Sequence, residues 1–517
     1  MKKITFILLL SMVITGFTSC KKFLNVTPVD NLSGNNYWKS TSDVEGYANG
    51  LYARLRTKFA TLSSTTSNRT TTGNYLFNAA DLRCAPAVIQ SGVTGMDRFI
   101  QNDVRAANDP DANVYLPTVF GGINKWKVWY DVIQGANIMV KEVGDMDPAV
   151  ISEAQRKAYI AEAIFLRNFC YFFMVRLYGD VPYYTDAYNE KALPRMPQVQ
   201  VMKNAIADLT AVKGDLPVRY DDQGKNGNRA MRGSAIGLLM HMNQWAASFD
   251  KGNEQPYYSA TVTLAEELAT YTQYSLIRPF NIQNNKKLFK GGTNEVLFEF
   301  IANVNYGEGF KQLTYSSDFF SHYPLKGEIT KTESNGYYEE DFMKKLFPAG
   351  EPDLRKDVWL ESYDLGNYSF QLKKYTNTYI SGTNFTVFND DNVVVFRLAD
   401  MLLLAAEAAN KLGQDDKALI FANQVRDRAG KTPLTSTGET LDYDIYLERT
   451  RELFCEGQYF YDLVRTRRIL PGETSSTRIS PGRTISPSDF NNGAWTWTID
   501  ASAMTNNPYM TLNNYWR

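Results

Sequence analysis

Three glutamates in the C-terminal part of the chain have a spacing that could support acid and base catalysis. Glu448, Glu452 and Glu456 follow one another at intervals of four residues, which places them in one row on a helix. Glycoside hydrolysis uses two carboxyl groups about 5 to 9.5 Å apart. Neighbouring members of such a row can meet that distance, so the row is a candidate catalytic site.

The alternative is that these glutamates form ion pairs that hold the fold together. Charged side chains that can pair with them are close in the sequence: Arg449, Arg451, Asp462 and Arg465. Buried pairs of this kind neutralise their charges and join a helix to its neighbours. We favour this structural role and expect replacement of Glu452 to reduce stability rather than turnover. The same role is expected for a further set of charged residues: Glu162, Arg167, Arg397, Glu407, Arg426 and Arg428.

Metal and cofactor chemistry has few candidate residues. The chain has two histidines, His241 and His322, so a histidine-rich metal site is excluded and a Ser-His-Asp triad has few ways to form. Residues 109–113 and 389–392 carry Asp and Asn, yet neither segment has the twelve-residue loop of an EF-hand. Because Asp, Asn and Pro favour turns, we interpret both segments as turns and predict no metal and no cofactor. His241 lies in a helical pattern and is expected to be an interior residue.

Aromatic residues make up 13% of the chain. Their flat faces suit packing in a core and stacking on sugar rings, and neighbouring amides, carboxylates or arginines can bond sugar hydroxyls. Two long segments without helical periodicity, 58–123 and 278–395, contain aromatics, and ordered loops of such length are usually functional. Ligand-binding candidates come from both segments: Tyr75, Asp81, Arg83, Asn305, Tyr306, Phe310, Tyr315 and His322. The alternative for each of them is packing within its own loop.

The N-terminus has the layout of an export signal. Two lysines precede an apolar run at 4–17, and the small residues Thr18 and Ser19 precede Cys20. The run is shorter than the roughly 20 residues that a bilayer span needs, so cleavage is favoured over a retained membrane helix. Small residues before a cysteine are similar to a bacterial lipobox, whose thiol is acylated, and cleavage without lipid is the alternative. We predict a signal peptide at 1–19 and a lipid anchor on Cys20.

Charge and cysteine content limit the partners and the redox chemistry. The formal net charge is −1 and 21% of the residues are charged, which argues against nucleic acid or anionic lipid as the main partner. Beyond Cys20 the chain has Cys84, Cys170 and Cys455, which are too widely spaced for a zinc site or a disulfide framework. One pair could still form in an oxidising compartment, and packing is the preferred role for Cys170 and Cys455.

Helices must position most of these residues. Apolar stripes at steps of three and four predict helices at 43–57, 124–143, 152–178, 197–213, 230–248, 257–272, 398–412 and 414–430. Ser152 and Gln155 have the sequence of a capping box, and Gly179 ends that helix. Helices joined by a few residues fold back as antiparallel pairs. About four pairs predict an all-α dominated, tetratricopeptide-like superhelix with inserted long loops and short strands, among them 294–300 and 392–396.

The mature chain has no linker poor enough in apolar residues to divide it. We therefore predict one domain at 20–517, with an N-terminal half at about 20–275 and a C-terminal half at about 276–517. After the signal, no segment approaches about 18 apolar residues in a row, so no further membrane span is expected.

Seven stretches, in order along the chain, resemble the SusD/RagB family. They are "SCKKFLNVTP", "WYDVIQGAN", "AEAIFLRNFCYFFMVRLYGDVP", "FRLADMLLLAAEAANKLG", "NQVRDRAG", "ERTRELFCEGQYFYDLVRTRR" and "NPYMTLNNYW". Each stretch alone is a weak signal, whereas the series covers the mature chain from end to end. The resemblance implies an outer-membrane lipoprotein of Bacteroidetes-type bacteria with a tetratricopeptide scaffold. Such proteins sit on a SusC-like TonB-dependent transporter and capture glycans, or sometimes peptides, before import.

The resemblance also implies a function for this chain: non-enzymatic binding of an oligosaccharide at the cell exterior. The family often has an Asp in a comparable early loop, which makes Asp81 the strongest polar candidate. Some surface-exported lipoproteins carry acidic residues after the lipidated cysteine, and none follows Cys20 directly here. Three alternatives stay open: peptide uptake by a protein of the same type, glycoside hydrolysis by the Glu448 row, and a purely structural contact with the transporter.

Overall fold

The computed structural model describes residues 37–59, 80–89, 100–104, 123–301, 336–361, 370–381, 386–472, 482–505 and 507–517. The long helices have these bounds: α3 Thr41–Phe59, α6 Lys127–Asp145, α7 Glu153–Tyr178, α8 Gln198–Val212, α9 Arg232–Phe249, α10 Glu254–Ala269, α15 Leu398–Lys411, α16 Asp415–Arg428 and α17 Gly438–Glu452. All eight predicted helices are present, with ends shifted by a few residues.

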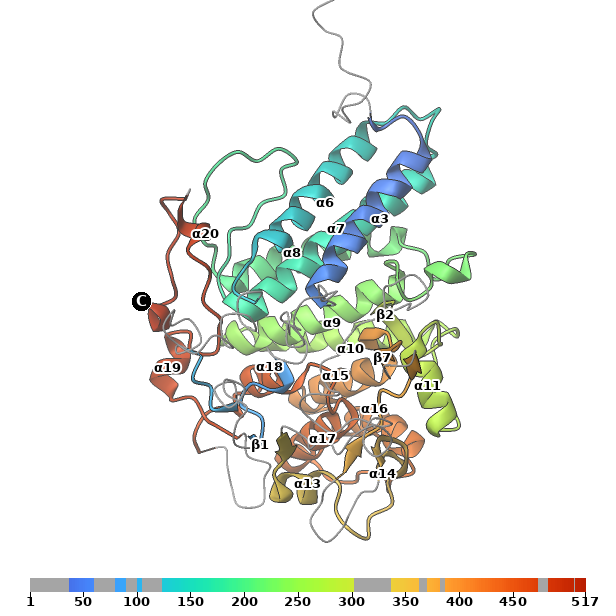
Figure 1. The fold of residues 1–517 in the computed structure, drawn as a ribbon, viewed down its shortest axis with the longest axis vertical. Helices are drawn as coiled ribbons and strands as arrows, with labels where there is room; N and C mark the ends of the chain where they lie inside the picture. Colours follow the sequence, from blue (N-terminus) through green and yellow to red (C-terminus); the bar gives the residue numbers. More distant parts are fainter. Residues whose placement is uncertain are drawn as a thin grey trace, which may run out of the picture.

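These helices form four pairs that pack in chain order. The pairs are α3 with α6, α7 with α8, α9 with α10, and α15 with α16. Contacts between α6 and α7, α8 and α9, and α10 and α15 join each pair to the next. In Figure 1 the first two pairs occupy one end of the molecule, α9 and α10 cross its middle, and α15 to α17 lie on the other side. The predicted tetratricopeptide-like superhelix is therefore confirmed.

Helix α7 shows how local sequence sets the ends of an element. The Ser152 side chain accepts a hydrogen bond from the Gln155 amide while the Gln155 side chain bonds the Ser152 backbone, which is the predicted capping box. Gly179 ends the helix with φ 73°, a conformation that favours glycine. Among the described residues, α7 alone is long and apolar enough to cross a membrane, and 83% of its most apolar window is buried inside the protein. It is the central helix of the core.

Short strands and helices fill the insertions between the helix pairs. Strands β2 Val296–Phe300 and β8 Val393–Arg397 pair antiparallel, so both predicted strands are confirmed. The other strands are β1 Ala87–Ile89, β3 Gly336–Tyr338, β4 Leu360–Glu361, β5 Gln371–Leu372, β6 Thr378–Ser381 and β7 Thr386–Asn389, which pair as β1 with β3, β4 with β5 and β6 with β7. The shorter helices are α11 Ile282–Lys290, α13 Glu340–Leu346, α14 Leu354–Trp359, α18 Tyr459–Arg465, α19 Pro487–Asn491 and α20 Ser502–Thr505.

The weak periodicity of segment 278–395 predicted a segment without helices, and this prediction is wrong. Helices α11, α13 and α14 lie within this segment. They are short, between 6 and 9 residues, so each offers too few apolar positions to show a helical period. Packing on neighbouring elements stabilises them: α11 contacts α14, α14 contacts β4, and α13 contacts α17.

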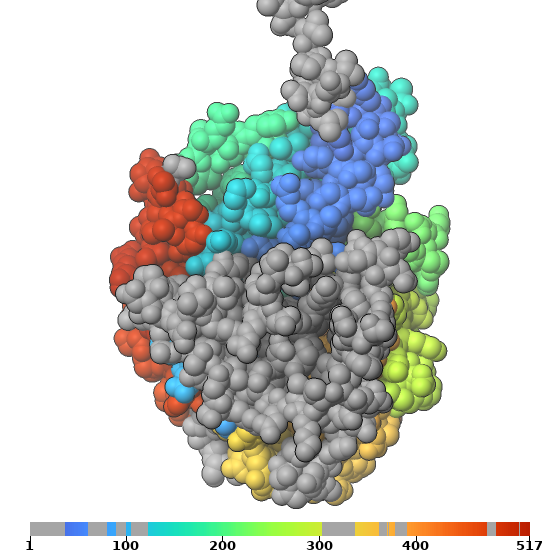
Figure 2. All heavy atoms as spheres, viewed as in Figure 1, coloured from blue at the N-terminus to red at the C-terminus, as the bar shows by residue number. Residues whose placement is uncertain are grey.

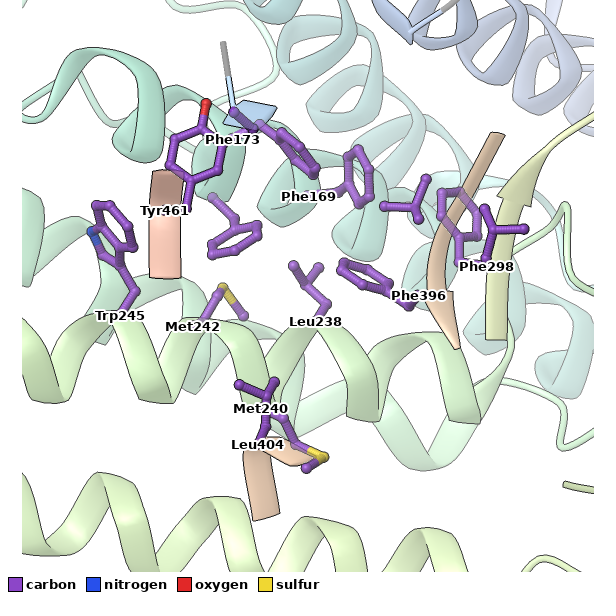
Figure 3. Packing of buried hydrophobic residues seen from close by; sticks show 14 of the residues in the cluster. Phe169, Phe173, Leu238, Met240, Met242, Trp245, Phe298, Phe396, Leu404 and Tyr461 are labelled. Atoms are coloured by element: carbon purple, nitrogen blue, oxygen red, sulfur yellow. The ribbon is translucent and has the colours of Figure 1, made fainter. Parts of the chain in front are cut away.

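An aromatic layer between α7, α9 and the β2–β8 pair forms the centre of the core. Figure 3 shows Phe169 of α7 between Phe173 of the same helix and the rings of Phe396 of β8 and Phe298 of β2, with Leu238 of α9 below this row. The ring centroids of Phe169 and Phe173 are 4.7 Å apart, and those of Phe169 and Phe298 are 5.4 Å apart. The core therefore joins residues from both halves of the chain.

The C-terminal segment binds back on the N-terminal helices. The Trp497 amide donates to the Leu177 carbonyl oxygen at 2.6 Å, and the Asn513 side chain donates to the carbonyl oxygen of Tyr178 at 3.1 Å. Arg195 donates to the Thr511 carbonyl oxygen at 2.7 Å. Figure 2 shows this segment, in red, along the side of the helices at that end. The two ends of the described chain are therefore parts of one packed structure.

Candidate functional site

Glu452 lies at the centre of a buried network of ion pairs. Its carboxylate accepts hydrogen bonds from Arg397 at 2.7 Å and from Arg355 at 2.9 Å, and it also pairs with Arg428. The side chains of Glu452, Arg355 and Arg428 are fully buried. We call this set the buried ion network, and its members are Glu295, Asp353, Arg355, Lys374, Arg397, Arg426, Arg428, Glu448, Arg451, Glu452 and Glu456.

The glutamate row of the sequence is only partly a helical row. Glu448 and Glu452 lie in α17, which ends at Glu452, and Glu456 follows a turn in which Cys455 has φ 62°. The prediction of one helical face is therefore wrong for Glu456. Its carboxylate still reaches the network, because Lys374 donates to it at 2.5 Å and Arg397 at 2.6 Å.

The pairing of these carboxylates is unsuitable for acid and base catalysis. Burial alone raises the pKa of Glu448, yet Arg355, Arg451 and Arg426 hold that pKa at about 2. Three arginines and a lysine likewise hold the pKa of Glu452 well below its ordinary value in spite of burial. A glycosidase needs one carboxyl group whose pKa is raised so that it can donate a proton. The row therefore has the predicted structural role.

The partners within the network differ in part from the prediction. Arg451 pairs with Glu448, as expected. Arg449 and Arg465, however, both bind Asp462, and Arg449 also binds Asp400. Arg449 lies in α17 and its side chain reaches Asp400 of α15 and Asp462 of α18, whereas Arg465 lies in α18 itself and also pairs with Glu407 of α15. The arginines that hold Glu452 come from β8, α14 and α16, which the sequence could not place beside it.

His241 is an interior residue of α9, as predicted. Its Nε2 lies 2.7 Å from Oδ2 of Asp400, which in turn binds Arg449. Burial lowers the pKa of His241, and this outweighs the opposing effect of Asp400. The imidazole is therefore neutral near pH 7 and belongs to the packed core.

Asp81 and Arg83 link the early segment 80–89 to the C-terminal part of the chain. The Asp81 carboxylate accepts a hydrogen bond from the Gly457 amide at 2.6 Å. Arg83 is fully buried between the rings of Phe460 and Trp497, at 4.4 and 4.9 Å from their centroids. Its guanidinium donates to three consecutive backbone carbonyl oxygens, those of Ala494, Trp495 and Thr496.

Both side chains are therefore engaged by their own chain, and ligand contact at them stays a prediction. The other candidates lie outside the described residues: the lipidation site Cys20 and the loop residues Tyr75, Asn305, Tyr306, Phe310, Tyr315 and His322. Segment 109–113 also lies outside them.

The described cysteines are buried and free. Cys84, Cys170 and Cys455 form no disulfide with one another. The sequence left one disulfide bond among them open, and the structure excludes it. The burial of Cys170 and Cys455 agrees with their expected packing role.

In segment 389–392 the carboxylate of Asp391 is kept away from solvent. Asp391 is buried and accepts hydrogen bonds from the backbone and side-chain nitrogens of Asn377 at 3.1 and 2.6 Å. The neighbouring Asn392 donates to Glu299 of β2 at 3.0 Å. Within the described part of the chain, no three His, Cys, Asp or Glu side chains are grouped so that they could hold a metal ion. The side chains of Asp390, Asp391 and Asn392 bind their own chain.

Glu299 is expected to make stability depend on pH. Burial raises its pKa to about 7, against the smaller effects of its hydrogen bonds from Asn392 and Gly292. A carboxyl group whose pKa is higher in the folded state stabilises the fold at acid pH, and this contribution is lost as pH rises from about 4.5 to about 7. The native protein should therefore lose about 3 kcal/mol of stability over this pH range. The Glu299→Gln variant, whose side chain does not ionise, should not show this loss.

The measurement is urea unfolding of the native protein and the Glu299→Gln variant at about pH 5 and about pH 8. The variant should gain stability relative to the native protein as pH rises. Equal pH dependence of the two proteins would contradict a raised pKa at Glu299. The exposed Glu340→Gln variant is the control and should follow the native protein.

Comparison with known protein families identifies the class to which this scaffold belongs. A model described as "SusD family" matches residues 219–516. A second model, described as "Starch-binding associating with outer membrane", matches residues 96–240. The chain belongs to the SusD family, as its seven sequence stretches predicted.

Similar proteins cover nearly the whole chain. A crystal structure of a SusD homolog from Bacteroides thetaiotaomicron VPI-5482 has 35% sequence identity and a TM-score of 0.78, over 92% of this chain and 99% of that one. A SusD-like protein of Formosa agariphila is 23% identical over 90% of this chain and 92% of its own length. Surface glycan-binding protein A from Bacteroides uniformis shares the fold, with 22% identity, a TM-score of 0.67 and coverage of 92% and 100%.

Proposed function

We propose that this protein is a non-enzymatic outer-membrane lipoprotein that binds oligosaccharides at the cell surface. It delivers them to a SusC-like TonB-dependent transporter, the partner implied by the family resemblance. The observation that carries the proposal is that the chain belongs to the SusD family. Its scaffold of four helix pairs agrees with this. The family-model description that mentions starch and the outer membrane, and the name of the surface glycan-binding relative, support the ligand class and the location.

The structural role of the Glu448 row supports binding without hydrolysis. The row was the main candidate for acid and base chemistry, and its described carboxylates are bound to arginines or a lysine. The proposed ligand contacts remain the loop residues Tyr75, Asn305, Tyr306, Phe310, Tyr315 and His322, together with Asp81 and Arg83. The last two also hold segment 80–89 to the C-terminal part of the chain.

Isothermal titration calorimetry tests the ligand class. The mature chain is titrated with a panel of neutral polysaccharides and, separately, with a panel of peptides. Saturable binding of at least one polysaccharide, with no release of reducing ends, is the expected result. Binding of peptides alone would replace the glycan by a peptide ligand. Release of reducing ends would instead establish a hydrolase.

The lipid anchor is tested by replacing Cys20. Export of the native protein in its host should place it in the membrane fraction and allow labelling with palmitate. The Cys20→Ala variant should lose the label and leave that fraction, because acyl chains supply about 0.8 kcal/mol for each buried methylene. Cys170→Ala is the matched control, since Cys170 is buried in the core and should not affect the label. An unlabelled native protein would show that the signal is cleaved without lipid.

A further inference from the structure

A small cavity lies where the early segment 80–89 meets the C-terminal helices. Its lining comes from Asp81, from β3 and α13, from α17 with the turn that follows it, and from the first half of α18. All of the lining residues except Tyr459 are buried. The volume of the cavity is about 10 Å³. Roughly 10 to 15 Å³ is enough for one water molecule, whereas organic ligands need far larger sites.

The guanidinium group of Arg449 brings a hydrogen-bond donor without a protein partner to this lining. Its Nε donates to Asp462 at 2.8 Å, and its Nη1 donates to Asp400. Its Nη2 has no hydrogen-bond partner in the part of the chain that the structure describes, although the side chain is only 1% exposed. Arginine keeps its protons at every pH at which proteins fold. A buried donor of this kind is costly to leave unpaired, so a ligand that accepts a hydrogen bond is expected beside it.

Two carboxylates on the same lining supply acceptors. The Asp462 carboxylate accepts from Nε of Arg449 on one oxygen and from Nε of Arg465 on the other, each at 2.8 Å. The Asp81 carboxylate accepts from the Gly457 amide at 2.6 Å. Each carboxylate oxygen has lone pairs for more than one hydrogen bond. A molecule in the cavity therefore has a donor on one side and acceptors on the other.

Charge restricts the occupant further. The Arg449 guanidinium opposes a metal or ammonium ion, and the carboxylates of Asp81 and Asp462 oppose an anion. A neutral molecule that both accepts and donates hydrogen bonds fits these charges. At this volume that molecule is water.

We propose that the cavity holds one ordered water molecule, which accepts a hydrogen bond from Nη2 of Arg449 and donates to the carboxylates of Asp81 and Asp462. The water links segment 80–89 to α17 and α18, in addition to the direct bond between Asp81 and the Gly457 amide. A buried water with about three hydrogen bonds is a permanent part of a folded protein. The site belongs to the scaffold and does not depend on which ligand the protein carries.

A high-resolution crystal structure of the native mature protein tests the site. One water peak should lie in the cavity, roughly 2.7 to 3.2 Å from Nη2 of Arg449 and from a carboxylate oxygen of Asp81 or Asp462. A cavity without electron density would overturn the inference. So would an Arg449 Nη2 that bonds a protein oxygen directly.

Magnetic relaxation dispersion of water nuclei tests the same site in solution, because it counts the water molecules that stay bound for long times. Leu453 is buried on the cavity lining, so Leu453→Phe places additional volume there. This variant should lose one long-lived water relative to the native protein. Leu453→Met conserves the side-chain volume and is the matched control, which should keep the native count.

An unchanged count in a folded Leu453→Phe variant would contradict the proposed water. The same loss in Leu453→Met would also contradict it, because that change leaves the space open. The native crystal structure tests the water whether or not Leu453→Phe folds.

Discussion

Replacing Glu452 by glutamine should lower the free energy of unfolding by about 3 to 5 kcal/mol. Its carboxylate is the common partner of Arg355, Arg397 and Arg428, all buried within the scaffold. The glutamine side chain fills the same space but carries no charge. Removing one partner of a buried ion pair leaves the others with an uncompensated charge in a region of low dielectric.

The remaining carboxylates cannot fully replace Glu452. Arg355 keeps Asp353 and Glu448, whereas Arg428 is left with Glu295 at 3.8 Å. Equilibrium urea unfolding followed by circular dichroism measures the change.

A surface ion pair provides the matched control for this experiment. Lys344 Nζ lies 2.7 Å from Glu340 Oε1, and their side chains are 46% and 50% exposed. Glu340→Gln makes the same chemical change in a solvated pair and should cost less than about 1 kcal/mol. If Glu452→Gln were equally mild, the buried ion network would not hold the fold together as we describe.

Replacing Phe169 by alanine should destabilise the protein by about 3 to 5 kcal/mol. Phe169 is fully buried, and its ring lies within 6.0 Å, between centroids, of Phe173, Phe298 and Phe396. Loss of the ring removes its burial from water and leaves a cavity that the surrounding rigid elements cannot close. The same urea titration measures this change.

Phe169→Leu is the conservative comparison, because leucine refills most of the space. It should cost no more than about 1.5 kcal/mol. Equal costs for the two variants would mean that the aromatic layer relaxes around a vacancy, which contradicts close packing between α7 and the β2–β8 pair.

Periodicity was sufficient to predict eight of the nine long helices of the described chain, all except α17, which was indicated only by its row of glutamates. Helix α7 carries its own capping box and C-terminal glycine, so its ends follow from residues within or next to it. Strands β2 and β8 were likewise visible as short apolar runs, although nothing in either run indicated that they pair across nearly one hundred residues of chain. The short helices α11, α13 and α14 were missed because a few residues show no period.

The candidate site was less predictable than the fold. The sequence identified Arg83 as a polar residue in an aromatic segment, which fits a ligand contact and a buried anchor equally well. The carbonyl oxygens that Arg83 binds lie at residues 494–496, and only folding brings them together.

The sequence by itself determined the family, the four helix pairs and their order along the chain, because these follow from local periodicity and from motifs read in series. Tertiary structure decided which charges neutralise one another. Glu452 is held by arginines from β8, α14 and α16, and Glu456 joins them after its helix has ended. Electrostatic pairing depends on distances in space, and residues far apart in the chain acquire those distances only when the core has packed.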